Sequence, residues 1–252
     1  MTTSERLKSI RAARGAGYLV LIDPDKWPEE QLIEFAAHAS ASGADALLIG
    51  GSLLLCSSFD HLVRQIRKHV ACPVIIFPGS SLQVSRHADA IFFLSLISGR
   101  NPTYLIGEQV KAAPLVKAFG VESISVGYML IESGRVTSAE FMSNTRAIPR
   151  DKVDIAKATA LAAQYLGMQM VYLEAGSGAP QSVPDEMIAG LNHYISLPII
   201  VGGGISTPEE AQRKVMAGAS FVVTGNVLEK ERNHNLIAEF AQAIHQKSFE
   251  PR

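Results

Sequence analysis

The sequence predicts a (β/α)8 TIM barrel, a fold of the α/β class, and three observations support this prediction. Eight short apolar segments recur at regular intervals along the 252 residues. Most stretches between them have helical spacing, and the chain length suits eight βα units. The apolar segments lack polar–apolar alternation, which indicates strands covered on both faces, as in a parallel sheet. A doubly wound sheet is the alternative, but "GGGIS" lacks the spacing of a dinucleotide-binding fingerprint.

The expected elements follow in order along the chain. The strands are expected at residues 17–23, 44–51, 73–79, 89–96, 122–131, 168–174, 197–204 and 219–226. The clearest helices cover residues 28–43, 151–167 and 206–218, and the first and last have proline and acidic residues near their starts. The stretch 80–88 is too short for a full helix, so we expect an irregular or single-turn element there. The result is one domain over residues 1–252, a barrel modified around its third helix.

Bulk composition excludes several classes of function. The chain has 23 basic and 24 acidic residues and a net charge of −1, so no overall field favours nucleic acid or an anionic membrane. The two cysteines, Cys56 and Cys72, provide no disulfide framework and favour a reducing compartment. The first 20 residues lack the apolar core of a signal peptide, and no apolar run approaches the ~20 residues that span a bilayer. We expect a cytoplasmic globular protein.

The carboxyl ends of the strands should carry the chemistry, because active sites of this fold lie at that end of the barrel. The last two expected strands end in glycine loops, at Gly202 to Gly204 and at Gly225–Asn226. Such loops leave backbone N–H groups open to an anion and allow its close approach. They could instead only turn tight βα corners, but the occurrence of the pattern in both loops favours a phosphate site.

Two oxygen-bearing side chains end the first two expected strands. Asp23 ends the first strand within "LIDPDK", and Ser52 follows the second within "GGS". One carboxylate and one hydroxyl could share a Mg²⁺ ion that keeps its waters and bridges substrate phosphates. Alternatively, Asp23 only caps the helix that follows its turn-rich segment.

Glu174 ends the sixth expected strand, within "VYLEAGSGAP". A glutamate beside a phosphate site can act as a general base. It could instead be an ion-paired structural residue, and spacing does not decide between these roles.

Several motifs together resemble the geranylgeranylglyceryl phosphate synthase family and its bacterial relatives. These motifs are "LIDPDK", "LLIGGS", "FPG", "SLISGRNPTYLIGEQV", "YLEAGSGAP", "VGGGI" and "TGN", between about residues 17 and 245. The resemblance implies an enzyme that joins a polyprenyl diphosphate, with geranylgeranyl diphosphate the expected donor, to sn-glycerol 1-phosphate. An ether bond forms and pyrophosphate is released, as a step of ether phospholipid biosynthesis.

The resemblance also implies roles for individual residues. Asp23 and Ser52 match the Mg²⁺ site of the family, and Glu174 matches the residue that takes the proton from the attacking hydroxyl. The glycerol phosphate site corresponds to Tyr172, Leu173, Glu174, Ala175, Gly176, Ser177, Gly178, Gly203, Gly204, Gly225 and Asn226.

One departure from the family pattern concerns Leu21. One branch of the family has a lysine two residues before the metal aspartate, where this chain has Leu21. The chain therefore looks like the second branch, whose members form homodimers or larger homo-oligomers. Phosphate recognition then depends more on backbone amides. "FPG", "IFFLSLI" and Tyr104 are candidates for lining a groove for the prenyl tail. These aromatic side chains could equally be barrel packing, and we expect packing for most of them. We also expect a peripheral contact with a membrane for the lipid product.

Two other classes of function share the expected phosphate site. A sugar-phosphate isomerase would need no metal and no apolar groove, so its activity would be insensitive to a chelator. A non-catalytic barrel that only binds a phosphate ligand would bind glycerol phosphate without turnover.

Overall fold

The computed structural model describes residues 1–230 and 235–245, and it forms a closed parallel barrel. The eight strands pair in chain order, and the last pairs with the first. They are β1 Gly17–Ile22, β2 Ala46–Ile49, β3 Val74–Ile76, β4 Ala90–Leu96, β5 Glu122–Leu130, β6 Met170–Glu174, β7 Ile199–Gly202 and β8 Phe221–Thr224. Each lies within one of the apolar segments, so the predicted fold class is confirmed.

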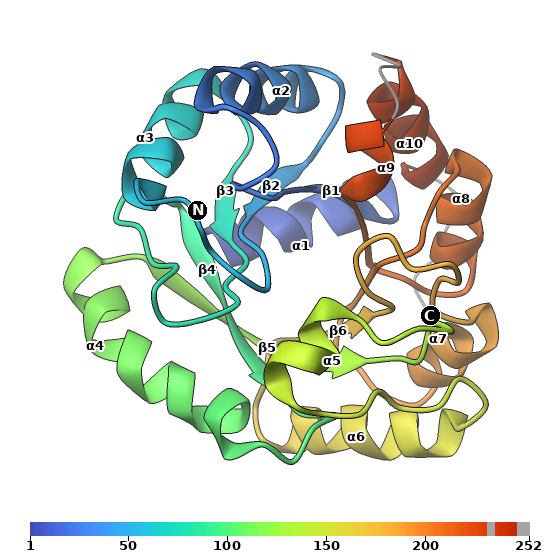
Figure 1. Cartoon of the computed structure of the whole chain (residues 1–252). Helices are drawn as coiled ribbons and strands as arrows, with labels where there is room; N and C mark the ends of the chain where they lie inside the picture. Colours follow the sequence, from blue (N-terminus) through green and yellow to red (C-terminus); the bar gives the residue numbers. More distant parts are fainter. Residues whose placement is uncertain (231–234, 246–252) are drawn as a thin grey trace.

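Helices surround the barrel and follow most of its strands (Figure 1). They are α1 Thr3–Arg14, α2 Glu29–Ala41, α3 Phe59–His69, α4 Glu108–Phe119, α5 Ser138–Ser143, α6 Val153–Tyr165, α7 Asp185–Asn192, α8 Pro208–Met216, α9 Asn226–Lys230 and α10 Leu236–Ile244. A π-helical turn, η1 Thr103–Gly107, leads directly into α4. Helix α8 begins within the segment that the sequence predicts to be helical. Its N-cap is Thr207, whose hydroxyl accepts a hydrogen bond from the Glu210 amide at 3.2 Å.

The third βα unit differs from the others, as predicted. No helix separates β3 from β4, and residues 77–89 form turns instead. Buried Gln83 organises this segment, because its Oε1 accepts from the Gly51 and Gly79 amides at 3.3 Å and its Nε2 donates to the Gly51 carbonyl at 2.8 Å. The same side chain therefore ties this segment to the loop after β2.

Alternate strand residues pack into two different apolar layers. On β6, Tyr172 lies in the barrel interior, whereas Val171 and Leu173 face the layer between the barrel and its helices. Leu7 of α1 belongs to the interior cluster and is fully buried. In Figure 1, α1 lies behind the barrel and α5 lies in front of it. One end of the barrel is thus closed by α1, and the carboxyl ends of the strands are left to form a site.

Candidate active site

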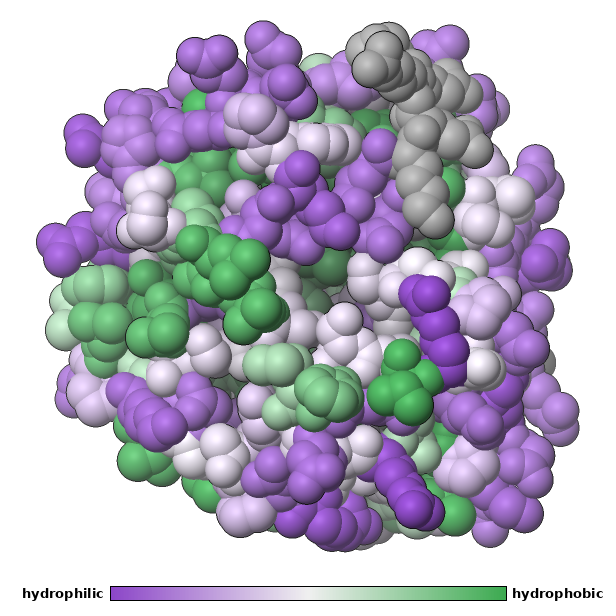
Figure 2. Space-filling model, in the orientation of Figure 1, coloured by the Kyte–Doolittle hydropathy of each residue, from purple (hydrophilic) through white to green (hydrophobic). Residues whose placement is uncertain are grey.

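A cavity of about 990 Å³ occupies the carboxyl end of the barrel. In the space-filling view, a hollow lies near the centre of this face and apolar side chains gather beside it (Figure 2). Residues at the ends of β1, β2, β6, β7 and β8 line the cavity. The sequence-predicted residues among them are Asp23, Ser52, Tyr172, Glu174, Gly176, Ser177, Gly178, Gly203, Gly204, Gly225 and Asn226. The barrel therefore brings together residues that lie up to about 200 positions apart in the sequence.

Leu173 and Ala175 are the exceptions. Both side chains are fully buried in the layer between the barrel and the helices, and neither lines the cavity. The contiguous motif included them, but side chains alternate between the two faces of a strand. The side chains of Leu173 and Ala175 therefore point away from the cavity, and Tyr172 and Glu174 are the members of this segment of β6 whose side chains face it. That the backbone of Leu173 and Ala175 belongs to the glycerol phosphate site stays a prediction.

Glu174 is the buried acid of the cavity, with 6% of its surface exposed. Its Oε1 accepts a hydrogen bond from the Gly176 amide at 2.6 Å. Among residues 1–230 and 235–245, no basic side chain forms an ion pair with Glu174. Burial raises the pKa of Glu174 to about 7, and the Gly176 amide and the nearby Tyr172 hydroxyl oppose this only in part. The pKa therefore places the protonation change of Glu174 near neutrality.

Aromatic rings form the floor beside Glu174. The rings of Phe77, Tyr128 and Tyr172 have centroids 5.3–5.8 Å apart. Burial, followed by the charge of Glu174, raises the pKa of both tyrosine hydroxyls well above the usual value. Both hydroxyls thus stay protonated at neutral pH, which leaves Glu174 as the acid–base group of this floor. Sequence reading missed Tyr128, which lies within the fifth strand rather than at its end.

The β7–α8 loop needs glycine for two reasons. Gly203 and Gly204 have backbone φ values of 82° and 70°, which residues other than glycine rarely adopt. A Cβ on Gly203 would lie 2.3 Å from Glu174 Oε1, so this glycine also makes room for the acid. In the described part of the chain, the amides of Gly203, Gly204 and Gly225 donate to no protein acceptor. These N–H groups are available to an anion, as the phosphate interpretation requires.

Direct contacts hold the neighbouring loops together. The Ser177 hydroxyl donates to Asn226 Oδ1 at 2.7 Å, which joins the loops after β6 and β8. Arg135 donates to the carbonyls of Ser177 and Gly178 at 3.0 and 2.7 Å. Arg135 lies in the segment after β5, which the sequence analysis did not consider. A polar run directly after the fifth apolar segment was the available signal.

Asp23 and Ser52 both line the cavity from the adjacent strands β1 and β2. Asp23 Oδ1 accepts from the Asp25 amide at 3.0 Å. A Cβ on Gly51, next to Ser52, would lie 3.6 Å from the same Asp23 oxygen, so the two loops approach closely. Asp25 fixes the second loop, because its carboxylate accepts from the amides of Leu55 and Cys56 at 2.8 and 2.6 Å.

Asp23 and Ser52 offer a carboxylate and a hydroxyl, and a hard cation requires oxygen ligands of this kind. Mg²⁺ is commonly held by one or two carboxylates together with water and substrate phosphates. Within the described ranges, no three His, Cys, Asp or Glu side chains gather into a metal site. Asp23 with Ser52 therefore fits Mg²⁺ as a partner of a phosphorylated substrate, and does not fit a metal held by protein ligands alone.

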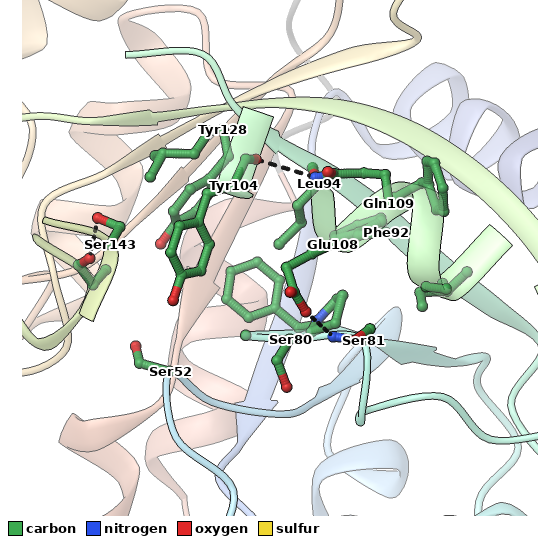
Figure 3. A pocket seen from close by; sticks show the side chains of 18 of the residues that line it. Ser52, Ser80, Ser81, Phe92, Leu94, Tyr104, Glu108, Gln109, Tyr128 and Ser143 are labelled. Carbon is green, nitrogen blue, oxygen red and sulfur yellow. Dashed lines mark hydrogen bonds between the residues drawn. The ribbon is translucent and has the colours of Figure 1, made fainter. Parts of the chain in front are cut away.

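A second, apolar pocket of about 100 Å³ adjoins the cavity (Figure 3). It lies between β3, β4, α4 and α5, and Phe92, Leu94 and Tyr104 contribute to its wall. The two hollows share Gly51, Ser52, Phe77, Tyr128, Ala139 and Met142. The aromatic candidates of the sequence analysis, Phe77, Phe92, Phe93 and Tyr104, all line this pocket, and Phe77 and Phe92 also pack in the barrel interior.

A closed parallel barrel with glycine loops and a buried acid at its carboxyl end defines a phosphate-binding (β/α)8-barrel protein. Comparison with known families makes this more specific. The chain belongs to the PcrB family, whose family model matches residues 8–244. The resemblance inferred from the motifs is thereby confirmed.

Named relatives agree with this assignment. The chain is 47% identical over 236 residues to geranylgeranylglyceryl phosphate synthase of Chitinophaga pinensis, which covers 93% of each chain. It is 48% identical over 214 residues, 84% of each chain, to the enzyme of the same name from Thermococcus gammatolerans. The crystal structure of (S)-3-O-geranylgeranylglyceryl phosphate synthase from Thermoplasma acidophilum, in complex with its substrate sn-glycerol-1-phosphate, superposes with a TM-score of 0.91. That structure is 36% identical and covers 97% of this chain and 99% of its own.

Proposed function

We propose that this chain is a prenyltransferase that joins a polyprenyl diphosphate to sn-glycerol 1-phosphate through an ether bond and releases pyrophosphate. One observation carries the proposal: Glu174, with a pKa of about 7, lies in a cavity bounded by glycine loops and adjoining an apolar pocket. A phosphate, a hydroxyl and an apolar tail each find a matching surface there. The relatives at 47% and 48% identity are named for this reaction.

The glycine loops bind and orient the glycerol phosphate in this mechanism. The free amides of Gly203, Gly204 and Gly225 receive the phosphate, and Ser177, held by Asn226, closes the loop beside them. Glu174 then lies where a substrate hydroxyl can donate to it. One carboxylate oxygen is held by the Gly176 amide, which leaves Oε2 to accept the proton.

In the transfer step one bond breaks, one bond forms and one proton is transferred. The bond between the prenyl carbon and the diphosphate oxygen breaks, and the glycerol hydroxyl oxygen forms the new carbon–oxygen bond. Its proton passes to Glu174, and pyrophosphate leaves with the electron pair of the broken bond. Asp23 and Ser52 would hold Mg²⁺, which when bound stabilises the negative charge on the diphosphate.

The apolar pocket offers a place for part of the prenyl tail. Its volume of about 100 Å³ is below the roughly 300–1,000 Å³ of typical sites for small molecules. A long tail would therefore extend beyond the pocket, toward the exposed apolar side chains around the cavity, such as Leu53, Leu55 and Met142. The length of the donor is thus a matter for measurement.

A product assay tests the proposed function. Purified protein is supplied with sn-glycerol 1-phosphate, or its mirror image sn-glycerol 3-phosphate, and prenyl diphosphates of graded length. We expect an ether product and pyrophosphate only with the first acceptor, and loss of both on chelation of Mg²⁺. Absence of product with every donor would contradict the proposal, and isomerisation of a sugar phosphate in the presence of chelator would favour the isomerase alternative.

We expect substitution of Gly204 by valine to weaken glycerol phosphate binding. Valine is strained at a φ of 70°, and its Cβ would lie 2.9 Å from the backbone of Gln181 and Ser182. The loop must shift, so the KM for glycerol phosphate should rise about tenfold or more, because small displacements at a site have large effects. Steady-state kinetics with both substrates varied will measure it.

Gly225→Val is a milder companion to this substitution. Gly225 lies outside the left-handed region, and its Cβ would approach the Leu21 carbonyl only to 3.2 Å. The KM for glycerol phosphate should therefore rise less than with Gly204→Val. If either variant changed only the KM of the prenyl donor, the assignment of the two substrates to their sites would have to be reversed.

Self-association of the chain stays a prediction. Leu55, Val136 and Phe141 are 75%, 72% and 79% exposed at the rim of the cavity, and contact with a second copy would remove apolar surface of this kind from water. The molar mass in solution, measured by light scattering, decides between a monomer and the expected homo-oligomer.

Throughout the described ranges, every helix is too short or too polar to cross a membrane.

A further inference from the structure

Helix α8 provides a common anchor for the loops after β6 and β7. Glu210, in the first turn of α8, accepts a hydrogen bond from the Ser182 hydroxyl in the β6–α7 loop. Its second carboxylate oxygen accepts from the amide and hydroxyl of Ser206, in the β7–α8 loop, at 2.9 and 3.2 Å. A single carboxylate therefore joins the two loops that carry most of the predicted phosphate-binding residues.

Lys214 forms a second anchor one turn further along α8. This side chain is buried, and its Nζ donates to the Val183 carbonyl at 2.7 Å and to Asp185 Oδ1 at 2.5 Å. Residues four positions apart lie on the same face of a helix, so Glu210 and Lys214 together hold residues 182–185 against α8. Movement of this segment relative to α8 would break all of these bonds.

The Glu210 side chain reaches beyond the start of α8. Thr207 caps the helix with its own hydroxyl, and the Glu210 carboxylate reaches outside the helix to the two loops. Hydrogen bonds to a charged group are shorter and stronger than neutral ones. Glu210 does not line the cavity, so any effect on substrate must pass through the loops.

We propose that Glu210 is a positioning residue that sets the separation between the two phosphate-binding loops. By holding Ser182 and Ser206, it determines how closely the β6–α7 loop lies to the free amides of Gly203 and Gly204. The affinity for the phosphate of the acceptor substrate then depends on Glu210. The inference rests on the proposed function, in which glycerol phosphate occupies these loops.

Replacement of Glu210 by alanine should act mainly on the acceptor substrate. We expect the Kd and KM for sn-glycerol 1-phosphate to rise by about 10- to 100-fold, and kcat and the KM of the prenyl donor to stay within about threefold. Glu209→Ala is the matched control, because Glu209 is exposed and lies in the same turn. Both variants remove one negative charge near the helix N-terminus, so the effect on the helix dipole is shared.

Ser182→Ala separates the contact between the loops from the rest of the anchor. It removes the bond to Glu210 and leaves the Ser206 contacts in place. We expect about a tenfold rise in the Kd for glycerol phosphate, as for the loss of a hydrogen bond to a charged group. The double variant should bind little worse than Glu210→Ala alone, since effects that act through one contact do not add.

Calorimetric titration of each variant with sn-glycerol 1-phosphate, combined with kinetics and thermal melting, decides the matter. Wild-type protein that does not bind glycerol phosphate would overturn the proposed function and this inference with it. Binding by the wild type, with unchanged Kd in Glu210→Ala and Ser182→Ala, would overturn the inference alone. A lower melting temperature, together with a lower kcat and a similar rise in the KM of both substrates, would mean a purely structural role for Glu210. Should Glu210→Ala not fold, the Kd of Ser182→Ala decides by itself.

Discussion

Replacement of Glu174 by glutamine should lower kcat by about 10²- to 10⁴-fold, the usual contribution of a positioned general base. Glutamine keeps the size of the side chain, and its amide oxygen can still accept the hydrogen bond from the Gly176 amide. It cannot take a proton from the substrate hydroxyl. The Kd for glycerol phosphate should change far less than kcat. Single-turnover kinetics and calorimetry on the same variant separate these two quantities.

The pH dependence of the wild type should identify the same group. Glu174 must be deprotonated to accept a proton, so kcat should rise with pH and level off above about 7, the pKa that burial produces. In Glu174→Gln this rise should vanish. A rise that persists in the variant would assign the pKa to another group and contradict the role of Glu174 as base.

Glu174→Gln should also stabilise the protein at alkaline pH. The pKa of Glu174 is raised from 4.5 to about 7 in the folded state, so unfolding becomes easier as pH rises between these values. Above pH 7 the charged, buried acid costs about 3 kcal/mol of stability, as a difference of this size in pKa implies. The neutral glutamine avoids this cost, and the melting temperatures should diverge above pH 5.

Melting also tests the structural alternative for Glu174. The ion-paired role left open by the sequence has no partner in the described part of the chain. A structural acid would make Glu174→Gln less stable at pH 8 and leave kcat near normal. Higher stability combined with lost turnover is the result expected of a catalytic base, because burial of the Glu174 carboxylate lowers the stability of the fold.

Replacement of Asp23 by asparagine should remove most of the activity while the fold is kept. A neutral amide binds Mg²⁺ poorly, and metal stabilisation of a leaving group contributes several kcal/mol, so we expect a loss of about 100-fold or more at limiting Mg²⁺. Ser52→Ala should cost less, because a hydroxyl is a neutral ligand. Turnover measured over a range of Mg²⁺ concentrations will show the size of each loss.

A binding measurement makes the metal prediction independent of turnover. Wild-type protein should bind pyrophosphate more tightly with Mg²⁺ than without it, and Asp23→Asn should lose most of this difference. Glu229→Gln is the control, because Glu229 lines the same cavity and this substitution also removes one negative charge. Unchanged turnover of Asp23→Asn at limiting Mg²⁺ would contradict the metal assignment.

The fold could be predicted because its determinants are local. Strands buried on both faces require continuous apolar segments, and a capping residue favours the start of a helix. For these reasons the strands and α8 lie where the sequence predicts them. The stretch after β3 was also predictable, since residues 80–88 are too few for a full helix between two strands. Glu174, Asp23 and Ser52 could be selected because active sites of this fold lie at strand ends.

The remaining features depend on contacts between distant segments. Closure of the barrel brings Phe77, which follows β3, against Tyr128 on β5 and Tyr172 on β6. The burial that raises the pKa of Glu174 exists only once the strands have closed. The contacts that Arg135 and Glu210 make with the phosphate loops join different βα units. The Thr-Pro-Glu-Glu pattern at Glu210 predicts a helix start, but neither it nor the polar run around Arg135 predicts a contact with another loop. Strand periodicity turns the Leu173 side chain away from the cavity, although the motif contained this residue. Sequence spacing therefore locates the strand ends, whereas burial, charge and loop separation at those ends arise from the packing of all eight units together.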